Sequence, residues 1–106
     1  MMSEEFVTVN AKMNFAFKVA KEAIVETIEK TFDELEGVVL AAPIELIINA
    51  DRSNFDLNIK YKVNHLNNFV FETKKMIFLL EQKIFSLINK KPSNINLVFD
   101  GIINEI

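Results

Sequence analysis

The chain contains no cysteine, only two glycines and only one histidine. The absence of cysteine excludes disulfides, thiolate catalysis and cysteine-ligated metal sites. A phosphate-binding loop needs clustered glycines, whereas Gly37 and Gly101 stand far apart in the chain. His65, the single histidine, has no partner nearby in sequence that could make it a general base, so we interpret it as a solvated loop residue. The sequence therefore predicts no catalytic residue, no metal site and no cofactor.

Long apolar runs and a strong net charge are also missing. No segment reaches the roughly 18 apolar residues of a membrane span, and the N-terminus MMSEEFVTVN lacks the layout of a signal peptide. A net charge of −3 provides no field that would attract nucleic acid or an anionic membrane. We therefore expect a cytoplasmic protein without direct membrane insertion. Its 106 residues, half of them hydrophobic, suffice for a single domain over residues 1–106.

Hydrophobic periodicity divides the first third of the chain into a strand and a helix. Residues 5–13 alternate between apolar and polar side chains, which predicts a half-buried strand. From there to Leu35 the apolar residues repeat at helical spacing. Asn14 is the preferred N-cap, because an earlier start would place Phe15 in the middle of the polar face. Gly37 then fits a left-handed C-cap at the end of this helix.

The remaining sequence predicts three strands and a second helix. These are strands at Ile44–Asn49 and Phe55–Val63 joined by a turn, a helix capped by Asn67 or Asn68 that stops before Pro92, and a strand at Ile95–Asp100. Gly101 can adopt a positive φ and supplies the turn after the last strand. Every strand has one apolar and one polar face. We therefore expect a two-layer α+β domain of order β-α-β-β-α-β, with a mixed or mostly antiparallel sheet and both helices on one face.

The second helix carries an additional aromatic stripe. Phe71, Phe78 and Phe85 are spaced seven residues apart, so they line up along the helix, well away from its main buried stripe. Something must cover three phenylalanines in a row. One alternative is the first helix, where Val25 and Phe32 form a similar off-centre stripe. The other is a second copy of the chain or a protein partner, which makes the three phenylalanines a candidate interaction surface.

The outward face of the predicted sheet bears on RNA binding. Apart from Val98 its positions are polar or charged, with several Asn and Lys side chains, and none is an aromatic residue on which a base could stack. The acidic pI of 5.2 also argues against nucleic acid. We expect no nucleic-acid partner. A small RNA-associated or ribosome-associated factor nevertheless remains the alternative function, because the Asn and Lys side chains gather on one face.

Four short segments match the pattern of a known family. Glu36-Gly37-Val38 matches its turn after the first helix, PIELIINADRSNFDLNIKYKV its hairpin, KPSNINLVFDGI its closing strand with a Gly-Ile end, and Met76, Leu80, Ile84 and Ile88 the four-spaced apolar residues of its second helix. On these segments the chain resembles the alkaline-shock-protein family, a bacterial general-stress or envelope-stress domain formerly of unknown function. The resemblance covers about residues 5–103.

The resemblance implies a non-enzymatic protein of cell-envelope homeostasis that self-associates or docks a protein partner. It implies a cytoplasmic location, with membrane association through a membrane-anchored partner. It also implies a kinase-like protein, of the dihydroxyacetone-kinase and fatty-acid-kinase type, as a second candidate partner. No enzymatic activity is established for the fold, so the resemblance carries no catalytic residues over to this chain. The leading expectation is an interaction or homo-oligomerisation module.

Overall fold

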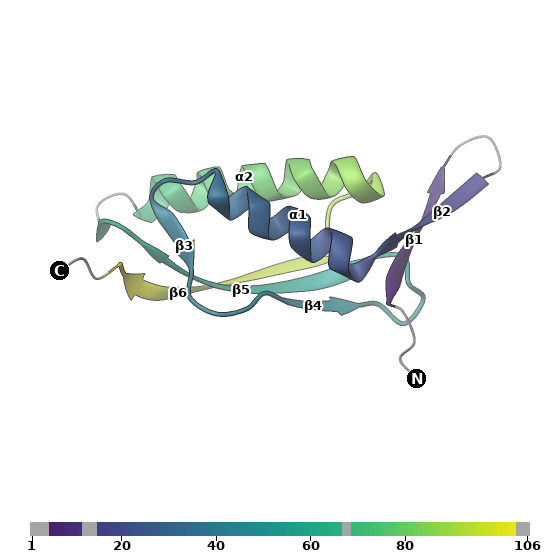
Figure 1. Ribbon diagram of the computed structural model, residues 1–106, viewed down its shortest axis with the longest axis horizontal. Helices are drawn as coiled ribbons and strands as arrows, with labels where there is room; N and C mark the ends of the chain where they lie inside the picture. Colours follow the sequence, from purple (N-terminus) through teal and green to yellow (C-terminus); the bar gives the residue numbers. More distant parts are fainter. Residues whose placement is uncertain (1–4, 12–14, 67–68, 104–106) are drawn as a thin grey trace.

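Residues 5–11, 15–66 and 69–103 are described by the computed structural model, and they form two helices and six strands. In chain order these are β1 (Phe6–Ala11), β2 (Phe15–Ala20), α1 (Lys21–Asp33), β3 (Val38–Leu40), β4 (Glu45–Ile48), β5 (Phe55–Val63), α2 (Phe69–Ile88) and β6 (Asn94–Ile102). Figure 1 shows the helices above the sheet of β3, β4, β5 and β6, with the β1–β2 hairpin at one end. The expected α+β class is confirmed, and β2 and β3 are additional strands.

β5 is the central strand of the sheet. β6 runs parallel to it along one edge, while β3 and β4 pair antiparallel with successive parts of its other edge. The sheet is therefore mixed, as expected. The parallel pair requires a crossover connection between its strands, and α2 provides it. Alternate side chains of β5 are buried, as its alternation predicted: Phe55, Leu57, Ile59, Tyr61 and Val63.

α2 packs its inward stripe onto the buried face of β5. The stripe consists of Met76, Leu80, Ile84 and Ile88, which belong to one buried cluster with the inward residues of β5. The Tyr61 hydroxyl lies 2.9 Å from the Thr73 hydroxyl, so the one polar atom that Tyr61 brings into this layer has a hydrogen-bond partner. The rings of Phe69 and Phe99 lie beside Tyr61 and close this end of the core.

The first helix starts later than the sequence predicts. Phe15–Ala20 forms β2, which pairs antiparallel with β1, and α1 begins at Lys21. Asn14, the predicted N-cap, lies outside the described residues. The prediction was wrong because the apolar residues here fit both periods, and Phe15, Phe17 and Val19 also alternate as in a strand. Pairing with β1 satisfies the backbone of both segments and places Val19 against the core.

The base of the β1–β2 hairpin is held by the turn between β4 and β5. Val7 and Val9 of β1 are buried in the main core. The backbone N–H of Thr8 donates to the carbonyl oxygen of Arg52 at 2.7 Å. The guanidinium of Arg52 also lies 4.5 Å from the centre of the Phe6 ring, a cation–π contact. These contacts fix the hairpin to the sheet at its root.

Gly37 does not have the predicted role of a left-handed C-cap. α1 ends at Asp33, and its C-cap Glu34 is right-handed, with φ of −84°. Gly37 is instead buried, and a Cβ atom there would collide with the Glu72 carboxylate and lie 3.1 Å from Oδ1 of Asn64. The close approach is made by the ends of side chains, chiefly the Glu72 carboxylate, and Gly37 has no positive φ angle that would require glycine.

Gly101 has the positive φ that the sequence predicts, at 115°, but it does not end the strand. It lies inside β6, where the register with β5 shifts by one residue: Tyr61 pairs with Phe99, and Val63 pairs with Ile102. The extra residue makes this a bulge, a feature in which glycine accommodates an unusual backbone angle. β6 continues beyond it to Ile102.

Replacing Gly101 with alanine is expected to destabilise the fold by about 1–3 kcal/mol, the usual cost of holding an L-residue in a sparsely populated backbone region. No atom lies within 4 Å of the added Cβ, so the loss comes from backbone strain alone. Urea unfolding measures it. Asp100→Ala, at the exposed neighbouring position, is the control and should stay within about 0.5 kcal/mol of the parent. Equal stability of Gly101→Ala and the control would contradict the bulge assignment.

Candidate interaction surface

α2 carries apolar residues on two faces, and only one of them lies in the core. The inward stripe of Met76, Leu80, Ile84 and Ile88 is fully buried. On the other face, Phe71, Phe78 and Phe85 are 68%, 59% and 50% exposed. At about 100° per residue, these three lie about 140° around the helix from the centre of the inward stripe. We call Phe71, Phe78 and Phe85 the outer stripe.

α1 does not cover the outer stripe. The contact between the helices is on another side of α2, where Lys83 Nζ lies 3.2 Å from Oε2 of Glu34 at the end of α1. Lys83 is about 140° around the helix from Phe78. Phe32 is buried in the main core and Val25 packs against that core. The alternative in which Val25 and Phe32 cover the outer stripe is therefore wrong.

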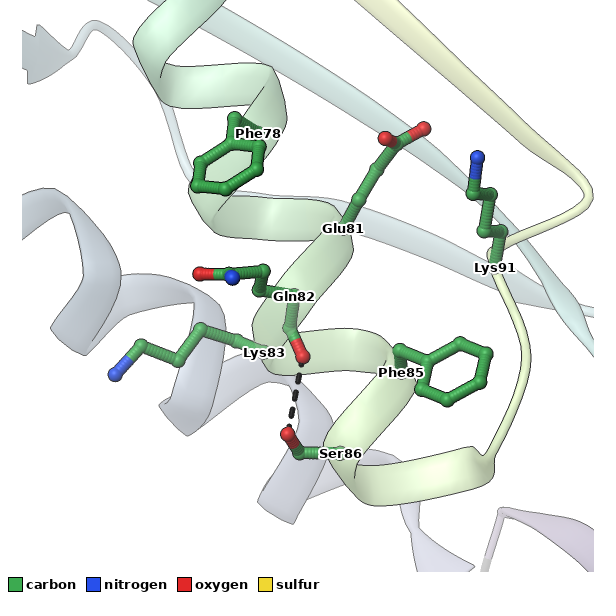
Figure 2. Close-up of a pocket in the computed structure, with 7 residues that line it drawn as sticks. All are labelled: Phe78, Glu81, Gln82, Lys83, Phe85, Ser86 and Lys91. Carbon is green, nitrogen blue, oxygen red and sulfur yellow. Dashed lines mark hydrogen bonds between the residues drawn. The ribbon is translucent and has the colours of Figure 1, made fainter.

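An open hollow of about 790 Å³ lies on the outer face of α2. Figure 2 shows Phe78 and Phe85 two turns apart on the helix, with Glu81 and Gln82 on the turn between them. Lys91, from the segment after α2, stands at its rim. The hollow therefore offers two aromatic rings, one carboxylate and the ammonium groups of Lys83 and Lys91 to a side chain from another molecule.

A second pair of exposed aromatic residues lies on the hairpin. Phe15 and Phe17 project from the same face of β2, are 58% and 42% exposed, and have ring centres 6.4 Å apart. The helical period predicted from Asn14 onward concealed this pair, because it placed both residues at the start of a helix. The signal that could have found them is the alternation of Phe15, Phe17 and Val19.

Asparagines on the outward face of the sheet hydrogen-bond to one another and to Glu45. The side-chain amide of Asn58 donates to the Glu45 carboxylate at 2.7 Å, and that of Asn96 donates to the Asn58 carbonyl oxygen at 2.7 Å. These amides form a ladder across β4, β5 and β6. The ladder includes asparagines that motivated the RNA-associated alternative, and that alternative stays a prediction.

The described side chains that could take part in catalysis or metal binding lie apart from one another. His65 is exposed in the loop before α2, and Asp100 is exposed in β6. In the turn between β4 and β5, hydrogen bonds from the hydroxyl and the backbone N–H of Ser53 lower the pKa of Asp51, as expected for a carboxylate that braces a turn. Over residues 5–11, 15–66 and 69–103, no three His, Cys, Asp or Glu side chains are grouped to hold a metal ion.

The comparisons with known proteins leave the surface geometry as the main basis for a functional proposal. No family model, curated protein or solved structure matches the chain. Within the described part of the chain, neither helix combines the length and the apolar character needed to cross a bilayer. The resemblance to the alkaline-shock-protein family stays a prediction.

Phe78→Glu is expected to leave the free energy of unfolding within about 0.5 kcal/mol of the parent, because an exposed side chain has little packing to lose. Leu80→Ala, two residues away but fully buried, should cost about 2–5 kcal/mol. Urea unfolding at low protein concentration separates the two cases. A loss of several kcal/mol in Phe78→Glu would show that Phe78 is part of the core.

Proposed function

We propose that the protein is a non-enzymatic interaction module that acts through the outer stripe of α2, by self-association or by docking a protein partner. The observation that carries the proposal is the outer stripe itself: three phenylalanines, each at least 50% exposed, on the helix side that faces away from the core. Single exposed apolar residues are ordinary, but three exposed phenylalanines aligned on one helix face favour a binding surface.

The construction of α2 supports this proposal. Its inward stripe is buried from Met76 to Ile88, so the helix cannot rotate to hide the outer stripe without opening the core. A surface held in this way is already in its binding conformation, and little conformational entropy is lost when a partner covers it. Aromatic residues are also enriched among the side chains that contribute most to binding energy.

The resemblance to the alkaline-shock-protein family adds a physiological context to the proposal. In that context the protein works in the cytoplasm in cell-envelope stress or homeostasis, without a cofactor and without a reaction of its own. A membrane-anchored protein or a kinase-like protein is then the candidate partner when the occupant of the surface is not a second copy. The outer stripe is the part of the chain that we assign to either contact.

Replacing all three outer-stripe residues with serine is expected to abolish self-association and partner capture while the domain stays folded. Sedimentation velocity over a range of concentrations measures the first, and quantitative affinity capture from the native cell measures the second. The matched control replaces three exposed apolar residues of the sheet with serine: Val39, Ile47 and Val98. The control should behave as the parent. Assembly and capture that survive in the outer-stripe variant would contradict the proposal.

A further inference from the structure

We infer that a second copy of this chain occupies the outer stripe, with the two α2 helices antiparallel and related by a two-fold axis at Phe78. The inference rests on the proposed function and names the occupant of the same surface. The stripe is symmetric about its middle residue, because Phe71 and Phe85 each lie seven residues from Phe78. Reversing the helix direction therefore places Phe71 of one copy against Phe85 of the other, and Phe78 against itself.

The charges beside the outer stripe are complementary in this arrangement. Lys74 and Glu81 lie on the same side of the stripe, about 40° and 60° from Phe78. A two-fold axis between antiparallel helices makes that side of one copy face the same side of the other. Lys74 precedes the axis by four residues and Glu81 follows it by three, so each lysine comes beside the carboxylate of the other copy. The dimer gains two such pairs.

The parallel arrangement is disfavoured by the same charges. In a parallel pair, residues at the same level along the two helices meet. The side of the stripe that carries Lys74 and Glu81 in one copy then faces the side that carries Lys75 and Gln82 in the other. Lys74 would then face Lys75 of the second copy, twice, and Glu81 would face only Gln82. Four lysines would gather between the first two phenylalanine layers, and like charges in such a contact oppose association.

Among the residues that the structure describes, neither Lys74 nor Glu81 forms an ion pair, and Lys91, which lines the hollow with Glu81, is not within ion-pair distance of it. Their helical neighbours three and four residues away are all apolar: Val70, Phe71, Ile77 and Phe78 for Lys74, and Ile77, Phe78, Ile84 and Phe85 for Glu81. The ion pairs among the described residues are Lys21–Glu5 and Lys83–Glu34, and neither includes these two side chains. A second copy supplies the partner that each of them lacks.

The hollow on α2 receives the lysine in this arrangement. The position between Phe78 and Phe85 of one copy lies opposite the position between Phe71 and Phe78 of the other, where Lys74 and Lys75 project. The aliphatic stem of Lys74 can cover the aromatic rings while its ammonium reaches Glu81 (Figure 2). Phe78, Phe85 and Glu81 of the lining suit a long, apolar side chain with a cationic end, while Lys83 and Lys91 at other points of the lining are themselves cationic.

The area buried in the proposed dimer is small, and this area limits the affinity that we expect. The stripe spans about 21 Å of helix at 1.5 Å per residue. Three half-exposed aromatic side chains can bury about 300 Å² per copy, given roughly 200 Å² for each whole side chain. This is well below the roughly 800 Å² per partner of a standard interface. We expect a weak, reversible dimer that forms at high protein concentration.

Charge reversal tests the arrangement. Sedimentation equilibrium at low salt, up to millimolar protein, compares the parent with K74E, E81K and the double variant K74E/E81K. Each single reversal replaces two attractive pairs by two repulsive ones and should weaken the dimer about tenfold. The double variant recreates the pairs with opposite polarity and should recover the parent affinity. High salt should reduce all of these differences.

Three results would overturn the inference. Single variants that dimerise as the parent does, or a double variant that does not recover, would reject the antiparallel register. A parent that stays monomeric at millimolar concentration would reject the second copy as occupant. Phe78→Glu, measured in parallel, separates these failures from failure of the proposed function. Loss of partner capture in Phe78→Glu would support the outer stripe as a binding surface. Unchanged capture and unchanged assembly would reject that assignment.

Discussion

The burial of one face of α2 against β5 is the contact on which the rest of the structure depends. β5 pairs with three other strands, and α2 is the crossover that lets β6 lie parallel to it. The inward stripe of α2, from Met76 to Ile88, fixes the rotation of the helix. Once that rotation is set, Phe78 and the rest of the outer stripe must point away from the core. The packing that stabilises the domain therefore also presents its candidate binding surface.

Most of this central layer could be predicted from the sequence, because its periodicities are long and unambiguous. The bounds of β5 at Phe55–Val63 were predicted to the residue, since nine residues of alternation fit no other structure. β2 was missed because Phe15–Ala20 satisfies both the helical and the strand period over only six residues. β3 has three residues, too few to show a period, and it exists because β5 offers it an edge.

The outer stripe could be found from its seven-residue spacing, but the sequence could not decide what covers it. What covers the stripe depends on the side from which α1 approaches α2. The tertiary packing around Lys83 and Glu34 determines that side. Two of the roles predicted for glycines were likewise wrong for reasons beyond the local sequence. Gly37 lies where the side chain of Glu72 comes close to it in space, and Gly101 accommodates a bulge whose partner lies in another strand.

The absence of cysteine permits a direct test of the central claim, which is that the outer stripe is a self-complementary surface. A single cysteine in place of Phe78 should form a disulfide-linked dimer under mild oxidation at high concentration, because this position meets its own copy at the axis. A cysteine in place of Phe71 alone should not, because the two copies of that position lie about 21 Å apart along the helices. Mixing the Phe71→Cys and Phe85→Cys proteins should restore cross-linking. Equal cross-linking at all three positions, or none at Phe78→Cys, would contradict the account.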